Sequence, residues 1–217
     1  MSYRELKRRV RERLLEGDTE GLAALAVEHP RTISALISLS YDKESALAWR
    51  AIEAVGPVVR EVTERSAAAG RNIVQRLLWS ITEESGGIGW SAVEMLGEAV
   101  RSRPDDFGDL IPIIIGLYEE PIFRPGVLYA ICRISEQAAV PAAPVRELIS
   151  EALADRDPEV RGRALLALQC LARTAGIEIP GTVGDLTGDG SRIRIYRDGV
   201  MTETTVGELA RELAQAG

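Results

Sequence analysis

Ala51-Ile52-x-x-Val55 is a short helical signature that recurs three more times along the chain. Its apolar positions lie at i, i+1 and i+4, so they share one face of a helix. Consecutive copies are 41, 38 and 34 residues apart, a spacing typical of stacked helical hairpins. Each hairpin buries its apolar face against the next, so the pattern predicts a helical-repeat stack. The other copies are Ala92-Val93-x-x-Leu96, Ala130-Ile131-x-x-Ile134 and Ala164-Leu165-x-x-Leu168.

Apolar segments between these copies predict the second helix of each hairpin. They cover residues 73–81, 107–117 and 145–153. Near the N-terminus, Gly17 is expected to end a first helix, Asp18 to cap a second, and Asp42 to cap the helix of the first copy. Small residues recur at fixed places in and just after the apolar signature, and Gly56 is one of them. They are expected to let neighbouring helices approach closely.

The segment leading into the last copy reads Asp155-Arg156-Asp157-Pro158-Glu159-Val160-Arg161. Asp157 suits a helix cap, Pro158 suits a first turn, and Arg161 is expected to reach a carboxylate or carbonyl of the adjacent repeat. The segment resembles the second-helix signature of HEAT-like repeats, of the type also found in phycobiliprotein lyases. The resemblance covers about residues 30–175, although the earlier copies lack this opening. It implies an all-α, right-handed α-α superhelix, a HEAT- or armadillo-like solenoid.

The chain changes character after Ala175. The Gly- and Pro-rich residues 177–190 predict an irregular connection. Alternation over residues 192–196 and the turn signal Asp198-Gly199 predict a β-hairpin. Thr205 and Glu208 form a capping box for a last helix. We therefore expect a repeat domain over residues 1–175, followed by a small tail over residues 176–217 that packs on the last repeat.

Composition narrows the class of partner and the location. The net charge of -7 and the pI of about 5.0 argue against nucleic acid, because binding to phosphate backbones depends on clustered cations. No apolar run approaches the roughly 18 residues that a membrane span needs, and no signal segment opens the chain. These features predict a cytoplasmic protein without a membrane partner. Cys132 and Cys170 lie in apolar helical segments, which predicts buried free thiols and no metal or cofactor.

The most unusual segment covers residues 79–90 and is bracketed by Trp79 and Trp90. Glycine amides at a helix start can hold an anion, although the two carboxylates here oppose that. The same groups could instead bind a cation or a peptide, with Trp90 as an aromatic face. The alternative is a tight structural turn whose tryptophans fill the core. The candidate partner-binding residues within it are Glu83, Glu84, Ser85, Gly86, Gly87 and Trp90.

Catalytic and metal-binding patterns are weak throughout. His29 is the only histidine and sits before Pro30, at an expected helix end. Adjacent carboxylates do not give the unlike environments that acid-base catalysis needs. Residues 185–190 resemble the start of a calcium loop, but its twelfth position is Tyr196 rather than Glu. The basic run over residues 4–13 is interpreted as a solvated helix face. We therefore expect no enzyme activity.

Two functions from different classes remain open. The first is a protein-interaction or scaffold module that binds a protein or peptide of unknown identity on the concave surface of the stack. The second, implied only by the resemblance, is a lyase- or chaperone-like protein that handles a tetrapyrrole or another prosthetic group. Oligomeric state is left open. The expected polar positions on the concave surface are Arg50, Glu53, Glu94, Glu98, Arg133, Glu136 and Arg163.

Overall fold

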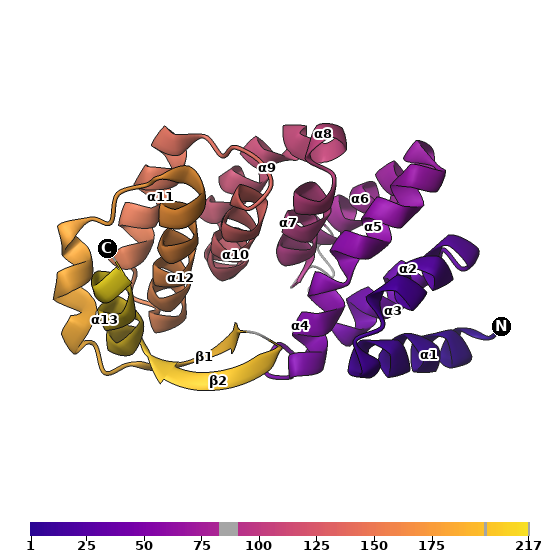
Figure 1. The fold of residues 1–217 in the computed structure, drawn as a ribbon, viewed down its shortest axis with the longest axis horizontal. Helices are drawn as coiled ribbons and strands as arrows, with labels where there is room; N and C mark the ends of the chain where they lie inside the picture. Colours follow the sequence, from indigo (N-terminus) through magenta and orange to yellow (C-terminus); the bar gives the residue numbers. More distant parts are fainter. Residues whose placement is uncertain (83–90, 198, 217) are drawn as a thin grey trace. The chain divides into compact units, whose positions relative to one another are not determined.

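The computed structural model describes residues 1–82, 91–197 and 199–216. These residues are mainly helical, and the chain divides into two compact units, residues 1–108 and 109–217. Each unit is a set of packed helices, and the second also holds a small antiparallel sheet (Figure 1).

The first unit is built from helices that pack on their near neighbours in the sequence. Helix α1 packs on α2, α3 and α4, whereas α5 packs on α2, α6 and α7. The two signature helices of this unit, α4 and α7, contact each other, as a repeat stack requires. The helices are α1 (Tyr3–Glu16), α2 (Thr19–Glu28), α3 (Thr32–Leu39), α4 (Ala46–Glu53), α5 (Val55–Arg65), α6 (Ala67–Thr82), α7 (Ala92–Ser102) and α8 (Pro104–Phe107).

Local capping signals are mostly used as the sequence predicts. Gly17 ends α1 with a left-handed φ of 71°, and the Asp18 side chain accepts a hydrogen bond of 2.9 Å from the Gly21 amide. The prediction that Asp42 caps α4 is wrong. Ser45 takes that position and accepts from the Leu47 amide at 3.2 Å, whereas Asp42 lies three residues earlier, where its side chain accepts from the Glu44 amide at 3.3 Å.

A break separates α4 from α5 at Ala54, inside the first signature copy. Pro57 explains it, because proline has no N–H to donate to the carbonyl of Glu53. Just beyond the break, a Cβ on Gly56 would lie 3.4 Å from the backbone oxygen of Glu98. Gly56 therefore faces α7, but an added Cβ would be in ordinary van der Waals contact, so the role of this glycine in close helix packing stays a prediction.

The second unit contains two further signature helices, α10 and α12, which run side by side (Figure 1). Ile131 and Ile134 of α10 and Leu168 of α12 are completely buried, and α11 packs on α12. The elements are η1 (Gly108–Leu110), which begins at the boundary between the units, α9 (Ile111–Gly116), η2 (Leu117–Glu119), η3 (Pro121–Phe123), α10 (Arg124–Ser135), α11 (Ala142–Leu153), α12 (Pro158–Ala175), η4 (Gly181–Gly188), β1 (Arg192–Arg197), β2 (Val200–Thr205) and α13 (Val206–Ala216).

Two local predictions fail in this region. A single helix over residues 107–117 is wrong, because the segment consists of α8, η1, α9 and η2 in short pieces. Pro112 in its middle removes a donor and clashes with the carbonyl four residues earlier. The irregular connection over residues 177–190 is also wrong in part, since residues 181–188 form the 3-10 helix η4.

The predicted hairpin and last helix are confirmed. Strands β1 and β2 pair antiparallel, with Ile193 opposite Thr204. The capping box is complete: Thr205 Oγ1 accepts from the Glu208 amide at 3.1 Å, and Glu208 Oε2 accepts from the Thr205 amide at 2.8 Å. Asp198 of the predicted turn lies outside the described residues, whereas Gly199 has the left-handed φ of 81° that such a turn needs.

The tail lies against α12. The Cδ1 atom of Ile193 occupies the space where a Cβ on Gly162 would be, so the glycine lets β1 sit close to the helix. Arg161 donates to Asp189 at 2.7 and 2.9 Å and to the carbonyl of Asp155 at 2.7 Å. Arg161 therefore ties the tail to the start of its own helix rather than reaching a neighbouring repeat.

The predicted fold class is confirmed: helical hairpins of the HEAT-like type are followed by a small hairpin and a helix. Among the described helices, none combines the length and the apolar composition required to cross a membrane.

Candidate functional site

The segment singled out in the sequence lies mostly outside the described residues. Glu83, Glu84, Ser85, Gly86, Gly87 and Trp90 all fall in that gap, so their partner-binding role stays a prediction. Trp79, at the edge of the segment, is described and is 67% exposed. The alternative interpretation, in which both tryptophans fill the core, is therefore wrong for Trp79.

Glu94, another candidate residue, is buried inside the first unit rather than on an open surface. Its side chain is 2% exposed and pairs with Lys43 at 2.5 Å. The other carboxylate oxygen, Oε2, is buried and has no hydrogen-bond partner among the residues that the structure describes. Lys43 is held in turn, because the Trp49 indole donates to its carbonyl at 2.9 Å. Burial of a carboxylate is costly without a counter-charge, so Lys43 stabilises the packing of α7.

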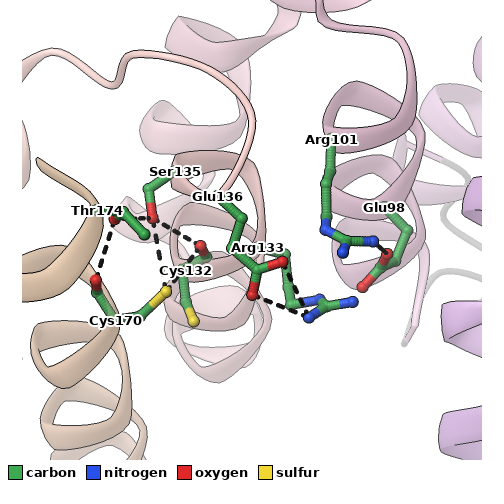
Figure 2. A network of polar contacts seen from close by, with 8 residues as sticks. All are labelled: Glu98, Arg101, Cys132, Arg133, Ser135, Glu136, Cys170 and Thr174. Atoms are coloured by element: carbon green, nitrogen blue, oxygen red, sulfur yellow. Dashed lines mark hydrogen bonds and ion pairs between the residues drawn. The ribbon is translucent and has the colours of Figure 1, made fainter.

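Glu98 lies one turn further along α7 and is fully buried as well. Its Oε2 atom is 3.5 Å from Arg101 and 3.5 Å from the position of a Cβ on Gly56 (Figure 2). Arg163 of the second unit is only 6% exposed. The expectation that Glu94, Glu98 and Arg163 are solvent-facing groove positions is thus wrong, since each is enclosed by its own unit's helices or neighbouring charges.

The two candidate arginines belong to different units and have local partners. Arg50 donates to the carbonyls of Leu14 and Leu15 at 3.5 and 3.4 Å, which satisfies free carbonyls at the end of α1. Arg133 pairs with Glu136, three residues later on α10, at 3.0 Å. Both arginines therefore have structural contacts within their own units.

A groove of about 840 Å³ lies in the first unit and was not found from the sequence. Ile33, Val58 and Val62 form its buried apolar floor. One wall comes from the end of α2, where Val27 is 39% exposed, and the other comes from α6, where Trp79 lies. The groove is therefore an apolar hollow with exposed apolar side chains at its edges.

The charged residues that line this groove are basic. Arg65 and Arg76 contribute to the lining, and no carboxylate does so among the described residues. Arg65 also pairs with Glu61 at 3.2 Å along α5. The α6 wall extends from Ala69 to Ser80, which is about 16 Å at the rise of a helix. These dimensions match about three turns of a helix.

A second cluster lies between α10 and α12 in the second unit. The ligand atoms of Cys132, Glu136 and Cys170 all lie within 4.8 Å of one another. Figure 2 shows the two sulfur atoms between the helices, with Ser135 and Thr174 beside them. Both cysteines are free thiols, as the sequence predicts, but only Cys170 is buried, and Cys132 is partly exposed.

Hydrogen bonds organise this cluster. As a thiol, Cys170 donates to the carbonyl of Cys132 at 3.2 Å, and its sulfur lies 3.6 Å from Ser135 Oγ. Ser135 Oγ also accepts from Thr174 at 2.9 Å. A hydrogen bond between the two sulfurs lowers the pKa of Cys170 and raises that of Cys132, and burial raises both. One thiol of the pair therefore ionises more readily than an ordinary cysteine.

Sequence reasoning missed this cluster because the cysteines are 38 residues apart and fit no compact ligand motif. The signal was the repeat itself. The last two signature copies are 34 residues apart. Cys170 also lies 34 residues after Glu136, so the two residues occupy equivalent positions in successive repeats. Cys132 precedes Glu136 by four residues and so shares its helix face. Equivalent positions on stacked helices become neighbours in space.

Comparison with known proteins adds little beyond the fold. No protein-family model matches the chain. No curated protein matches it either. Among solved structures, an engineered protein is similar at 15% identity and a TM-score of 0.44, over 99% of this chain and 94% of that one. An archaeal HEAT-like repeats protein from Thermococcus onnurineus is similar at 15% identity and a TM-score of 0.33, over 96% and 95%.

At these TM-scores neither structure carries an argument about function. The packed helical hairpins are observed in the chain's own helices. The predicted likeness to phycobiliprotein lyases has no support from the comparisons.

Proposed function

We propose that this protein is a cytoplasmic protein-interaction module without catalytic activity of its own. Its first unit would bind an amphipathic helix of a partner protein in the groove between α2 and α6. The observation that carries this proposal is the apolar floor of Ile33, Val58 and Val62, flanked by a tryptophan that is 67% exposed. Exposed apolar surface around a concave apolar floor is typical of helix-in-groove recognition.

The length and charge of the groove define the partner. A wall of about 16 Å accommodates about three helical turns, which present apolar residues at i, i+4 and i+7. Arg65 and Arg76 favour acidic residues beside that apolar face, because opposite charges speed association and fix orientation. The proposed partner segment is therefore an acidic amphipathic helix.

A labelled peptide tests the proposal directly. We would use a helical 18-residue peptide with leucines at i, i+4, i+7 and i+11 and glutamates flanking them, and measure binding by fluorescence anisotropy. Trp79→Ala should weaken binding by about tenfold or more, since exposed aromatic residues at interfaces are common hot spots. Arg76→Glu should weaken binding less than Trp79→Ala does, by about threefold to tenfold. The loss caused by Arg76→Glu should be larger at low salt than at high salt.

Two controls make the result specific. Arg60→Glu changes an exposed arginine of the same charge on α5 that does not line the groove, so peptide affinity should stay within about twofold. A peptide with lysines in place of the glutamates should bind more weakly than the acidic one. Equal affinity for wild type and Trp79→Ala would contradict the proposed site.

The alternative function makes a different prediction in the same sample. A protein that handles a tetrapyrrole would take up such a pigment in a one-to-one ratio and would show its visible absorbance. Stoichiometric pigment uptake together with failure to bind either peptide would favour that alternative.

The separate prediction for Glu83 and Glu84 can be tested with the double change Glu83→Gln and Glu84→Gln. If these carboxylates contact cationic groups of the partner, binding should be lost while the melting temperature stays nearly unchanged. A cost of several kcal/mol in stability would instead assign them a structural role.

A further inference from the structure

We propose that Cys132, Glu136 and Cys170 form a binding site for one zinc ion between α10 and α12. The proposal is independent of the peptide groove, which lies in the other unit. It rests on three ligand atoms, two sulfurs and one carboxylate oxygen, that lie within 4.8 Å of one another. The two helices that carry them are packed side by side, so the site is built on rigid elements.

The donor set selects the class of metal ion. Two thiolates and a carboxylate suit a borderline-soft ion such as zinc, whereas calcium and magnesium require oxygen ligands. Zinc binds sulfur at about 2.3 Å, so two thiolates in a tetrahedral site are about 3.8 Å apart. The ligand atoms lie within 4.8 Å of one another, about 1 Å beyond that value, so zinc binding would draw the side chains slightly closer together.

The surroundings also suit a metal site. Arg133 donates to both carboxylate oxygens of Glu136, at 3.0 and 3.3 Å, and so fixes the orientation of that ligand. Ser135 Oγ lies 3.6 Å from the Cys170 sulfur, and its hydroxyl hydrogen, which it donates to the carbonyl of Cys132 at 2.7 Å, would have to turn to reach a Cys170 thiolate. The positive charge of Arg133 balances the single negative charge that zinc, two thiolates and one carboxylate carry together.

Coordination would be completed by water. The described residues contribute three ligand atoms to this group and no fourth. Cys132 and Glu136 are partly exposed while Cys170 is buried, so an ion can approach from the side of Cys132. Binding displaces the protons of the two thiols into solvent, and affinity should therefore fall as pH decreases.

The test uses the full reduced chain with Zn²⁺ and a chromophoric chelator as competitor. We expect one zinc ion per chain. Co²⁺ in place of zinc should give thiolate-to-metal charge-transfer absorption and the intense visible bands of tetrahedral cobalt. This spectrum needs no variant, so it tests the site even if a substitution impairs folding. Absence of stoichiometric zinc binding, or a cobalt spectrum without thiolate bands, would overturn the proposal.

Variants then locate the ion. Cys132→Ser and Cys170→Ser should each abolish one-to-one binding, and Glu136→Gln should weaken it by about tenfold or more. Glu159→Gln is the matched control, because Glu159 is also paired with an arginine, Arg163, on one of the same two helices. Affinity unchanged in both cysteine variants would place the ion elsewhere and overturn the site.

The competing state is a disulfide. Mass spectrometry of the protein isolated without added oxidant would show a loss of two hydrogens and no reactive thiol if the two sulfurs are joined. That result, persisting under conditions in which zinc is available, would contradict the proposal. The proposal would be supported if zinc raises the melting temperature of the wild type but not that of the Cys170→Ser variant.

Discussion

The two units cover the sides of their helices differently. In the second unit, the chain's own tail lies on α12, with Val206, Leu209 and Leu213 of α13 no more than 3% exposed. In the first unit, the side of α5 between α2 and α6 remains a groove of about 840 Å³. A repeat stack cannot bury every face against its own hairpins, so a face needs a cap or a partner. The tail shows that an amphipathic helix is one suitable cover.

Removing a side chain from the covered face should have the largest effect. Leu213 is 2% exposed in the tail, and Leu213→Ala should lower the free energy of unfolding by about 3 kcal/mol, because it leaves a cavity. Urea denaturation measures the change. Leu15→Ala, at a leucine that is 50% exposed on α1, is the control and should change stability by less than about 0.5 kcal/mol. Similar losses in both variants would mean that the tail is not packed as described.

Removing the counter-charge of a buried carboxylate should cause the next largest loss of stability. Lys43→Met leaves the Glu94 carboxylate enclosed without its counter-charge and should cost about 2 kcal/mol. The double variant with Glu94→Gln should recover most of that loss, because the uncompensated charge is gone. A double-mutant cycle in urea measures the coupling. Additive effects of the two changes would show that the pair does not interact.

The ion pair that ties the tail to α12 should contribute less and depend on pH. Burial opposes ionisation of Asp189, but hydrogen bonds from Ser191 and Arg161 outweigh it and lower its pKa below the usual value. The unfolded chain therefore binds a proton first as pH falls. The contribution of Asp189 is complete well above about pH 4 and is lost as pH falls through the lowered folded-state pKa.

Asp189→Asn checks this pH dependence. The change should cost about 1 kcal/mol at pH 7, and the difference from wild type should shrink as the pH is lowered through that window. Urea denaturation at a series of pH values measures it. A difference that stays constant down to pH 2 would contradict the assigned role of the charge.

Substitution of an exposed residue beside the groove of the first unit should change stability least. Trp79 is 67% exposed, so Trp79→Ala should change the free energy of unfolding by less than about 0.5 kcal/mol, although it should weaken peptide binding. Thermal and urea unfolding measure the first effect. A cost of 2 kcal/mol or more would show that Trp79 supports the core, and the contrast between covered and open faces would fail.

Much of the fold could be predicted because its signals are local. The alanine-centred signature identifies α4, α7, α10 and α12, and the capping box at Thr205 marks the start of α13. The predictions at Asp42 and around Pro112 failed for the same reason. In each segment more than one local signal was present, and the surrounding structure determined which residue caps or interrupts the helix.

The sites were harder to predict, because they depend on residues that are distant in the sequence. Polar type alone suggested that Glu94 and Glu98 face solvent, yet both are buried: Glu98 lies against Gly56 of α5, and Glu94 pairs with Lys43. The groove exists because α2, α3, α5 and α6 leave a gap between them, and no period in the sequence predicts that gap. The cluster of Cys132, Glu136 and Cys170 required the offset between repeats to be applied to ligand residues.

The sequence by itself determined the helical repeat, the hairpin, the last helix and most caps, since apolar spacing and backbone preferences act within a few residues. Only the tertiary structure decided which faces are covered, which carboxylates are buried and which thiols meet. Those outcomes depend on the packing of whole helices, where a shift of one turn exchanges the neighbours of every side chain.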